Sequence, residues 1–393
     1  MASLLLAVIY LAFISLGLPD SLLGSGWPAM HTDLGAPLSA MGLVLMIIAA
    51  GTVVSSLASD FLTRKLGTGP VTVISILLTA GAMLGFSFSR TFWLLCVLAV
   101  PYGLGAGGVD AALNNYVALH YKSRHMSWLH CFWGLGALVS PFIMSAALTG
   151  GAGWSGGYSL VSYIQFGITA LVLFSLPLWK KREDSGKAAK ALTLPQTLKL
   201  KGVAFLLIAF FCYSALEATA MQWASSYFTE HKGVSEEVAA MLGSLFYIGI
   251  TAGRFVSGFI SEKLGDKRLI RLGICVTAAG VVLLLLPVRA YEVSVAGFVV
   301  AGLGCAPVYP CIIHSTPANF GEENSQAVIG VEMAFAYIGT TFMPPLFGLI
   351  AQYAGIGLMP LWLALFVIFL FCTTELLNRT VRKPSGREEK ADV

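Results

Sequence analysis

Long apolar runs separated by short polar stretches repeat along almost the whole chain. A helix needs about 20 apolar residues to cross the hydrocarbon core of a bilayer. No stretch has the alternating pattern of a transmembrane strand, and a helix satisfies its own backbone amides within the bilayer. The pattern predicts an all-α membrane protein with twelve transmembrane helices, near residues 4–26, 38–61, 70–88, 92–119, 127–148, 157–178, 202–228, 236–261, 269–288, 293–317, 327–353 and 358–377.

The composition agrees with a surface that mostly faces lipid. Hydrophobic residues make up 57% of the chain and charged residues only 11%, whereas a soluble domain has about 25% charged residues. The formal net charge of +4 is small and does not indicate a nucleic-acid partner. The seven cysteines lie inside apolar runs and lack the spacing of a zinc site or a disulfide framework. We therefore expect a lipid bilayer partner and no bound metal cofactor.

The basic residues predict the orientation in the membrane. Of the 24 lysines and arginines, all but Arg90, Lys232, Arg254 and Arg289 lie in the central loop, the C-terminal tail, or loops on the same side. Cytoplasmic loops carry an excess of basic residues. The distribution predicts a multi-pass protein of the plasma (inner) membrane with both termini in the cytoplasm.

One long polar segment, residues 179–201, divides the spans into two groups of six. It predicts an N-terminal six-helix bundle at 1–178, a cytoplasmic linker at 179–201 and a C-terminal six-helix bundle at 202–378. The polar tail at 379–393 is expected to be disordered.

The two groups of spans are related by an internal repeat at an offset of about 198 residues. Four features recur in the same order: Lys65–Gly67 and Lys263–Gly265, Gly103–Gly105 and Gly302–Gly304, Asp20…Trp27 and Glu217…Trp223, and Gly136…Pro141 and Gly339…Pro344. Duplicated six-span halves are typical of transporters that expose one central site alternately to each side of the membrane. The repeat predicts two pseudo-symmetric bundles with such a site between them.

Two motifs resemble the major facilitator superfamily. The segment Gly258–Arg268 is similar to its signature loop, and the segment Gly153–Tyr158 to its entry into span six. The resemblance implies the two-bundle fold and charge contacts between the halves at the cytoplasmic side. The first-half copy departs from the motif, because Asp60 replaces a glycine and Arg64 replaces the acid. The residues expected to act in gating are Asp60, Arg64, Arg254, Glu262, Arg268 and Glu332.

Four acids lie within predicted spans: Asp20, Asp110, Glu217 and Glu332. A charged side chain at the centre of a span costs at least about 2.5–3.5 kcal/mol, so each is a functional-site hypothesis. Asn114 follows Asp110 by one helical turn and shares its face. Such a carboxylate–amide pair can form part of a sodium site or a proton carrier. The residues expected to couple transport to a cation are Asp20, Asp110, Asn114 and Glu217, with Asp110 and Asn114 as the possible Na⁺ ligands.

Amides, histidines and tryptophans lie near these acids along the chain. Aromatic rings can stack on the apolar face of a sugar ring while acids and amides bind its hydroxyl groups. A lone histidine in a helix is more often a packing residue, although its pKa also suits a proton relay. About half of the tryptophans could belong to the interfacial aromatic belt. The residues expected to bind substrate are Asp20, Trp27, Asn114, Asn115, His130, Trp133, Glu217, Gln222, Trp223 and His314.

Within the superfamily, the pattern is most similar to the fucose-permease and sodium–glucose group. The features that carry this resemblance are the acid of span one, the acid and asparagine of span four, and Gln222 beside Trp223 in span seven. The resemblance implies a monomeric importer of a monosaccharide, coupled to H⁺ or Na⁺ and without enzymatic activity. A proton-coupled efflux antiporter for amphipathic compounds is the alternative. An intramembrane enzyme or receptor is a third class, but the sequence lacks the nucleophile, metal-pair and prenyltransferase motifs that such an enzyme would need.

Overall fold

The computed structural model describes residues 2–179, 192–288 and 290–381, and all regular structure in these ranges is helical. Twelve of the described helical segments are long and apolar enough to cross a membrane, which confirms the predicted fold class. Most of the predicted linker (180–191), Arg289 and the end of the predicted tail (382–393) lie outside the described residues.

The first six spans are built from α1 to α7. Their bounds are α1 Ala2–Asp20, α2 Leu22–Asp33, α3 Met41–Leu66, α4 Thr68–Phe88, α5 Phe92–His120, α6 Ser123–Thr149 and α7 Gly153–Phe174. The short α8 (Leu194–Leu198) lies within the predicted linker. The last six spans are built from α9 Val203–Ser226, α10 Glu236–Leu264, α11 Asp266–Leu285, α12 Tyr291–Cys305, α13 Val308–Phe320, α14 Glu322–Ala354 and α15 Met359–Thr380. A π-helical turn at Tyr227–His231 extends α9.

Two of the predicted spans are interrupted. The first predicted run divides into α1 and α2, which are separated by a turn at Ser21, directly after Asp20. The tenth divides into α12 and α13 at Ala306 and Pro307. Proline has no backbone N–H and so removes a helical hydrogen bond. The break after Asp20 lies where Pro19 and the nearby glycines weaken the helix.

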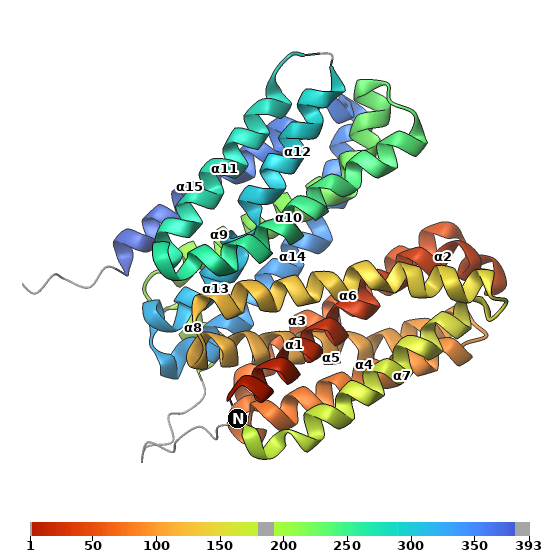
Figure 1. Cartoon of the computed structure of the whole chain (residues 1–393), viewed down its shortest axis with the longest axis vertical. Helices are drawn as coiled ribbons and strands as arrows, with labels where there is room; N and C mark the ends of the chain where they lie inside the picture. The colour runs from red at the N-terminus through yellow and green to blue at the C-terminus, as the bar shows by residue number, and fades with distance from the viewer. Residues whose placement is uncertain (1, 180–191, 289, 382–393) are drawn as a thin grey trace, which may run out of the picture.

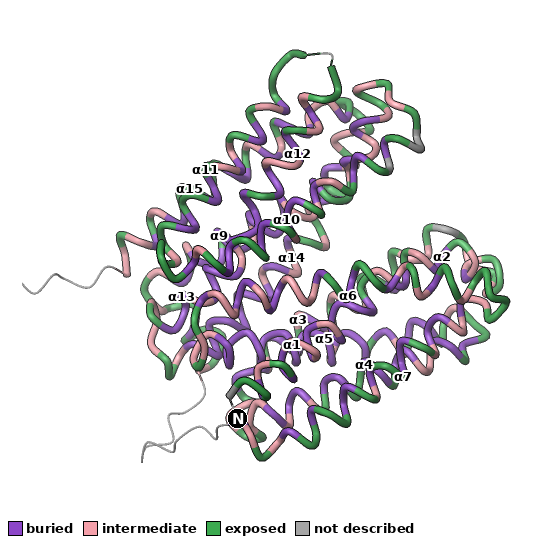
Figure 2. Tube along the Cα trace, viewed as in Figure 1, coloured by how far each residue is buried: buried purple, intermediate pink, exposed green. Residues whose placement is uncertain are grey.

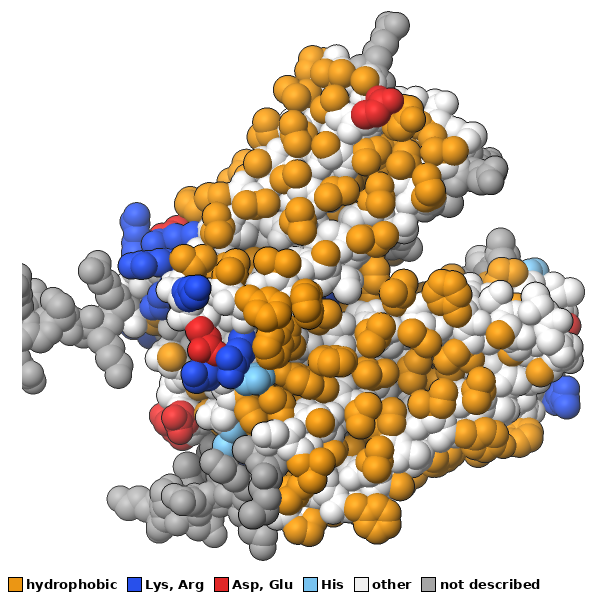
Figure 3. Space-filling model, viewed as in Figure 1, with side chains coloured by type: hydrophobic (Ala, Val, Ile, Leu, Met, Phe, Trp, Pro, Cys, Tyr) orange, Lys and Arg blue, Asp and Glu red, His pale blue; other side chains and the backbone are white. Residues whose placement is uncertain are grey.

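The helices form two bundles that meet along one side and diverge along the other (Figure 1). The helices α3 and α6 of the first half pack against α14 and α10 of the second. Lysines and arginines gather at the end where the bundles meet, and a hollow separates the two bundles at the opposite end (Figure 3). We call these the basic end and the open end.

Glycines show that the two halves share their local geometry. Gly67 and Gly265 have φ of 87° and 75°, and each lies between two consecutive spans of its half. A Cβ atom on Gly136 would lie 2.3 Å from the carbonyl oxygen of Ile14, and one on Gly339 would lie 2.8 Å from that of Phe211. These equivalent positions therefore let α6 approach α1 and α14 approach α9 closely. The structure supports the repeat inferred from the sequence.

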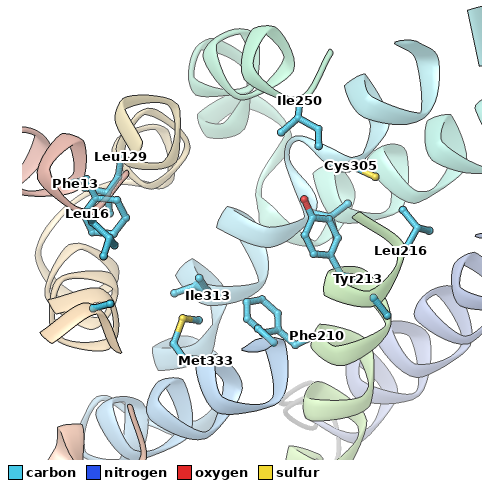
Figure 4. Packing of buried hydrophobic residues seen from close by; sticks show 14 of the residues in the cluster. Phe13, Leu16, Leu129, Phe210, Tyr213, Leu216, Ile250, Cys305, Ile313 and Met333 are labelled. Atoms are coloured by element: carbon cyan, nitrogen blue, oxygen red, sulfur yellow. The ribbon is translucent and has the colours of Figure 1, made fainter. Parts of the chain in front are cut away.

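Each bundle buries its own interior (Figure 2). Phe13, Leu16 and Leu129 pack within the first half, while Phe210 and Tyr213 pack within the second (Figure 4). The outer surface is also apolar, with large side chains such as Phe142 and Phe174 exposed. A soluble protein rarely exposes such a continuous apolar surface, so this surface fits a lipid environment.

Candidate functional site

Asp20 lies at the last residue of α1, on the side of the first half that faces the second. Its side chain is exposed although it lies in the middle of a membrane span. One carboxylate oxygen accepts a hydrogen bond from the Trp133 indole N–H at 2.8 Å, and the other accepts one from the Tyr102 hydroxyl at 3.3 Å. Asp20 is thus an accessible carboxylate held by two uncharged donors.

The position of this pair depends on Gly17, one turn before Asp20. A Cβ atom at Gly17 would lie 2.1 Å from the backbone carbonyl oxygen of Trp133. No side chain fits there, so the glycine lets α1 and α6 touch. This close approach brings the Asp20 carboxylate within hydrogen-bond distance of the Trp133 ring.

Glu217 occupies the corresponding place on α9 but has a different partner. Its carboxylate pairs with Arg254 of α10 at 3.0 Å, and Arg254 is only 3% exposed. The Arg254 guanidinium also lies 5.7 Å from the centre of the Trp133 ring, within the range of a cation–π contact. Asp20, Trp133, Arg254 and Glu217 therefore form one continuous chain of contacts that joins the two halves.

Asp110 lies deeper, in a buried cluster. Its oxygens accept hydrogen bonds from Asn114 at 2.8 Å and from the hydroxyl group of Tyr337, in the other half, at 2.6 Å. The Asn114 carbonyl oxygen lies 3.1 Å from Nε2 of His130. The Asn114 amide nitrogen thus faces the carboxylate of Asp110, and its carbonyl oxygen faces His130.

His130 is buried between aromatic rings from both halves. It makes edge-on contacts with Phe13, at 5.4 Å between ring centres, and with Tyr309, at 4.9 Å. Its ring is inaccessible in this conformation. His130 therefore belongs to the packed interface between the halves, where it contacts Asn114.

The other predicted tryptophan and amide residues make no described contact with Asp20 or Glu217. Trp27 is 2% exposed and packs against Phe92. Trp223 donates a hydrogen bond to the carbonyl oxygen of Pro344 at 2.9 Å and so joins α9 to α14. Gln222 is exposed, and α9 turns it about 140° from Glu217 at 100° per residue. The structure does not place Trp27 or Trp223 in the cavity wall, because both serve helix packing.

Asn115 and His314 contact the opposite half close to the basic end. Asn115 accepts a hydrogen bond from Ser325 at 2.6 Å. His314 contacts Asp266 through Nδ1 at 2.7 Å and the backbone carbonyl oxygen of Tyr121 through Nε2 at 3.2 Å. The prediction that these two residues line the substrate site is therefore not supported, since both side chains join the halves.

Most of the predicted gating residues do lie at the basic end. Glu262 of the second half pairs with Lys122 at 3.1 Å and with Arg124 at 3.0 Å. Arg64 pairs with Asp60 at 2.8 Å and donates a hydrogen bond to the backbone carbonyl oxygen of Glu323, across the interface. These contacts hold the halves together at this end.

Two of the predicted gating residues make no described contact with the opposite half. Arg268 is exposed and makes no described ion pair. Its neighbour Asp266, which accepts a hydrogen bond from Ser123, makes the contact between halves instead. Glu332 is fully buried and accepts a hydrogen bond from Thr316 of its own half. Glu332 thus lies within the second bundle rather than across the interface.

Tyrosines complete the site, and the sequence analysis did not identify them. Tyr102 and Tyr337 donate hydrogen bonds to Asp20 and Asp110, and Tyr247 donates one to the backbone of Gly134. Tyr102 precedes Asp110 by two helical turns, so helical spacing could have placed both on one face. The spacing could not reveal that Tyr337 reaches Asp110, because these residues lie in different halves.

The fold and this site define a polytopic membrane transporter, in which carboxylates, an arginine and aromatic rings link two six-helix halves. The sequence model of the Major Facilitator Superfamily matches residues 9–235 and 205–392. The chain belongs to this superfamily.

Its relatives include transporters with named and unnamed substrates. The chain is 26% identical over 367 residues to the uncharacterized transporter y4wD of Sinorhizobium fredii, across 88% of this chain and 89% of that protein. It is 21% identical over 267 residues to the glucose/mannose transporter GlcP of Bacillus subtilis, across 65% of each protein. The structure of the E. coli fucose:proton symporter FucP superposes with a TM-score of 0.78, at 18% identity, over 95% of this chain and 98% of that one.

Proposed function

We propose that this protein imports a monosaccharide by alternating access, with a proton as the coupling ion. The observation that carries the proposal is the hydrogen bond between Trp133 and the exposed carboxylate of Asp20, at the boundary between the two halves. The exposed carboxylate can accept hydrogen bonds from sugar hydroxyl groups. The indole ring beside it offers an apolar face of the size of a pyranose.

Two further observations support a sugar as the substrate. GlcP, which matches this chain over 65% of its length, is named as a glucose and mannose transporter. The cavity wall also brings hydroxyl and carboxylate groups together, through Tyr102 and Asp20, rather than presenting one acid in apolar surroundings. An amphipathic efflux substrate would be better served by the second kind of wall, so we favour a sugar.

The geometry of Asp110 favours H⁺ over Na⁺ as the coupling ion. Both of its oxygens face hydrogen-bond donors, namely Tyr337 and Asn114. A proton needs one carboxylate oxygen, whereas a hard cation needs several oxygen ligands around it. Asp20 and Asp110 are therefore our proposed proton-coupling residues.

The direction of loading follows from the charge at the basic end. Loops rich in lysine and arginine remain in the cytoplasm, so we assign the basic end to the cytoplasm and the open end to the outside. In this conformation the cavity would load from outside. Passage to the cytoplasm requires the contacts of Glu262, Asp266 and Arg64 to separate.

Uptake into proteoliposomes tests the proposal. Labelled sugars are offered under an imposed proton gradient, an imposed sodium gradient or neither, and we expect one sugar to accumulate only with the proton gradient. Accumulation driven by sodium alone would overturn the coupling. Absence of any sugar uptake, together with increased drug resistance of an efflux-deficient host, would favour the antiporter alternative.

A matched pair of variants locates the site. Asp20→Asn should lower proton-driven accumulation about 100-fold, since general acid–base groups typically contribute that much or more. Asp33 also accepts a hydrogen bond from a tryptophan, Trp154, at 2.7 Å, but it lies at the end of α2. Asp33→Asn should therefore transport like the unmodified protein. Equal losses in both variants would contradict a specific role for Asp20.

A further inference from the structure

Two adjacent prolines remove hydrogen bonds from α14 near the middle of its span. Pro344 and Pro345 both lie inside this helix. Proline has no N–H group, so it cannot donate to the carbonyl oxygen four residues before it. The carbonyl oxygens of Thr340 and Thr341 therefore lack their usual helical donors, and no side chain in the described part of the chain donates to either oxygen. The turn carries two consecutive unpaired acceptors.

Prolines of the first half leave no comparable acceptors at two positions. Pro19 frees the carbonyl oxygen of Ser15, but the side-chain amide of Gln165 donates a hydrogen bond to that oxygen at 2.8 Å. Pro141 of α6 is the repeat equivalent of the first proline of the pair. It frees the carbonyl oxygen of Ala137, a residue that is only 7% exposed. Neither of these oxygens is both unpaired and accessible.

The unpaired turn continues a row of α14 side chains that faces the first half. Met333, Tyr337 and Thr341 are spaced by four residues, so they share one face of the helix. Tyr337 donates a hydrogen bond to Asp110 at 2.6 Å, and the Met333 sulfur lies 3.9 Å from the amide nitrogen of Asn114. Thr341 is the next member of the row, one turn nearer to the open end. The helix lies at the boundary between the two bundles (Figure 1).

The polar groups of this turn are accessible on that face. Thr340 is exposed, and its hydroxyl donates within the helix to the carbonyl oxygen of Ala336 at 3.0 Å. Thr341 is half-buried, and its hydroxyl has no hydrogen-bond partner among the residues that the structure describes. At about 100° per residue, the two threonines lie about 60° and 40° to either side of Tyr337. Both therefore flank the direction of the first half.

Contacts with α9 hold the turn in place. A Cβ atom on Gly339 would lie 2.8 Å from the carbonyl oxygen of Phe211, so α14 touches α9 on the side opposite Tyr337. Just after the unpaired turn, the Trp223 indole donates a hydrogen bond to the carbonyl oxygen of Pro344 at 2.9 Å. The unpaired oxygens thus belong to a packed helix, and acceptors fixed in this way bind a ligand at a low entropic cost.

We propose that this turn is the sugar-binding subsite of the second half and that it recognises two adjacent hydroxyl groups. The consecutive carbonyl oxygens of Thr340 and Thr341 accept hydrogen bonds from neighbouring hydroxyls of a sugar ring. The Thr341 hydroxyl, which is both a donor and an acceptor, binds a third oxygen of the sugar. The inference rests on the proposed function, because it names the part of the substrate that the second half recognises.

Alanine at the two proline positions supplies the missing donors. In the double variant Pro344→Ala with Pro345→Ala, the restored N–H groups bond to both carbonyl oxygens, which then no longer accept from a sugar. Equilibrium binding of labelled D-glucose, D-mannose and L-fucose to the purified protein measures the effect. The sugar that binds the unmodified protein should bind about tenfold or more weakly to the double variant, as expected for two lost hydrogen bonds. The unfolding temperature should not fall, because the helix gains two hydrogen bonds.

Monodeoxy derivatives of that sugar identify the recognised hydroxyls. With the unmodified protein, removal of either of two adjacent hydroxyls should weaken binding about fivefold. With the double variant, the same removal should have no further effect, because groups that interact have non-additive effects. A role of the prolines in helix bending alone would instead weaken the binding of all derivatives alike. Pro141→Ala is the matched control and should bind the sugar normally, since the Ala137 carbonyl is buried.

The outcomes separate this inference from the proposed function. If none of the three sugars bound the unmodified protein, the proposed function would be wrong, and the subsite with it. If one sugar bound equally to the unmodified protein and the double variant, only the subsite would be wrong, and the two carbonyl oxygens would bind water alone. An equal loss of binding in Pro141→Ala would also overturn the subsite, because the effect would then come from the removal of any proline.

Discussion

The two halves carry repeat-related acids in different settings, which we call the first wall and the second wall. Asp20 in the first half is bound by the uncharged donors Trp133 and Tyr102, and its side chain is exposed. Glu217 in the second half is bound by the charged Arg254. The duplication thus preserves the position of an acid but not its chemistry. The first wall offers a group that can change its protonation or its ligand, and the second offers a neutralised pair.

This difference shows that the two halves of a duplicated fold can use equivalent acids in different ways. A carboxylate that must bind and release a proton cannot also be held permanently by an arginine, because the cation stabilises the charged form. The exposed Asp20 is free of that constraint. Glu217 instead holds Arg254 against the ring of Trp133. A residue pair of the second half thus helps to position the tryptophan of the first half.

Among the variants that test this comparison, removal of the Arg254 side chain should have the largest effect on stability and transport. Arg254→Gln leaves Glu217 as an uncompensated acid, and breaking a buried pair in this way costs about 3–5 kcal/mol. We expect a large drop in the thermal unfolding temperature of the purified protein and loss of transport. Asp20→Asn, which breaks no ion pair, should unfold close to the normal temperature.

The double variant Arg254→Gln with Glu217→Gln is the control for this effect. Because it removes both charges, it should recover most of the lost stability. If the double variant were as unstable as the single one, the pair would not be the source of the stability, and the contrast between the two walls would be wrong.

Changing Trp133 separates the two contacts of its ring and should have an intermediate effect. Trp133→Phe keeps an aromatic face beside Arg254 but removes the indole N–H that binds Asp20. A lost hydrogen bond to a charged group is worth about 1.5–3 kcal/mol. We expect about a tenfold or greater loss of sugar affinity, measured by equilibrium binding, while the unfolding temperature stays nearly constant.

The matched control is Trp154→Phe, which removes the same kind of hydrogen bond to Asp33 at the end of α2. It should leave sugar affinity unchanged. If Trp133→Phe bound sugar normally while Trp133→Ala did not, the stacking face alone would matter, and the hydrogen bond to Asp20 would have no part in recognition.

The fold could be predicted from the sequence because lipid imposes a strong constraint on length and polarity. Twelve runs, one polar linker and the repeated glycines specify two bundles of six helices. Asp20 and Glu217 could also be identified from the sequence, since an acid within a span is rarely without a role. Trp133 could be identified because an aromatic ring can stack on a sugar. It could not show that Arg254 pairs with Glu217, because that contact depends on how α9 and α10 are rotated against each other.

The contacts between the halves were the least predictable part. His314 and Asn115 have residue types suited to a binding site, yet they lie at the closed basic end. Asp266 replaces Arg268 because the first turn of α11 faces Ser123 of the other half. Such contacts belong to one conformation of a moving interface, and helical periodicity carries no information about the partner across it.

The smallest effect should come from the basic end, where exposed charges hold the halves. Glu262→Gln removes both ion pairs to Lys122 and Arg124. Exposed pairs contribute little to stability, so the population with an open basic end should rise by only about two- to fivefold. The distance between spin labels at the exposed Lys65 and Lys263 positions measures this population. The matched variant Glu375→Gln removes an ion pair to Arg271 that lies within the second half, so it should leave the population unchanged. The rise should also shrink at high salt, because mobile ions already screen exposed charges. A salt-independent rise, or an equal rise in Glu375→Gln, would mean that the basic end is not held by charge. The difference between the halves would then be limited to the settings of Asp20 and Glu217.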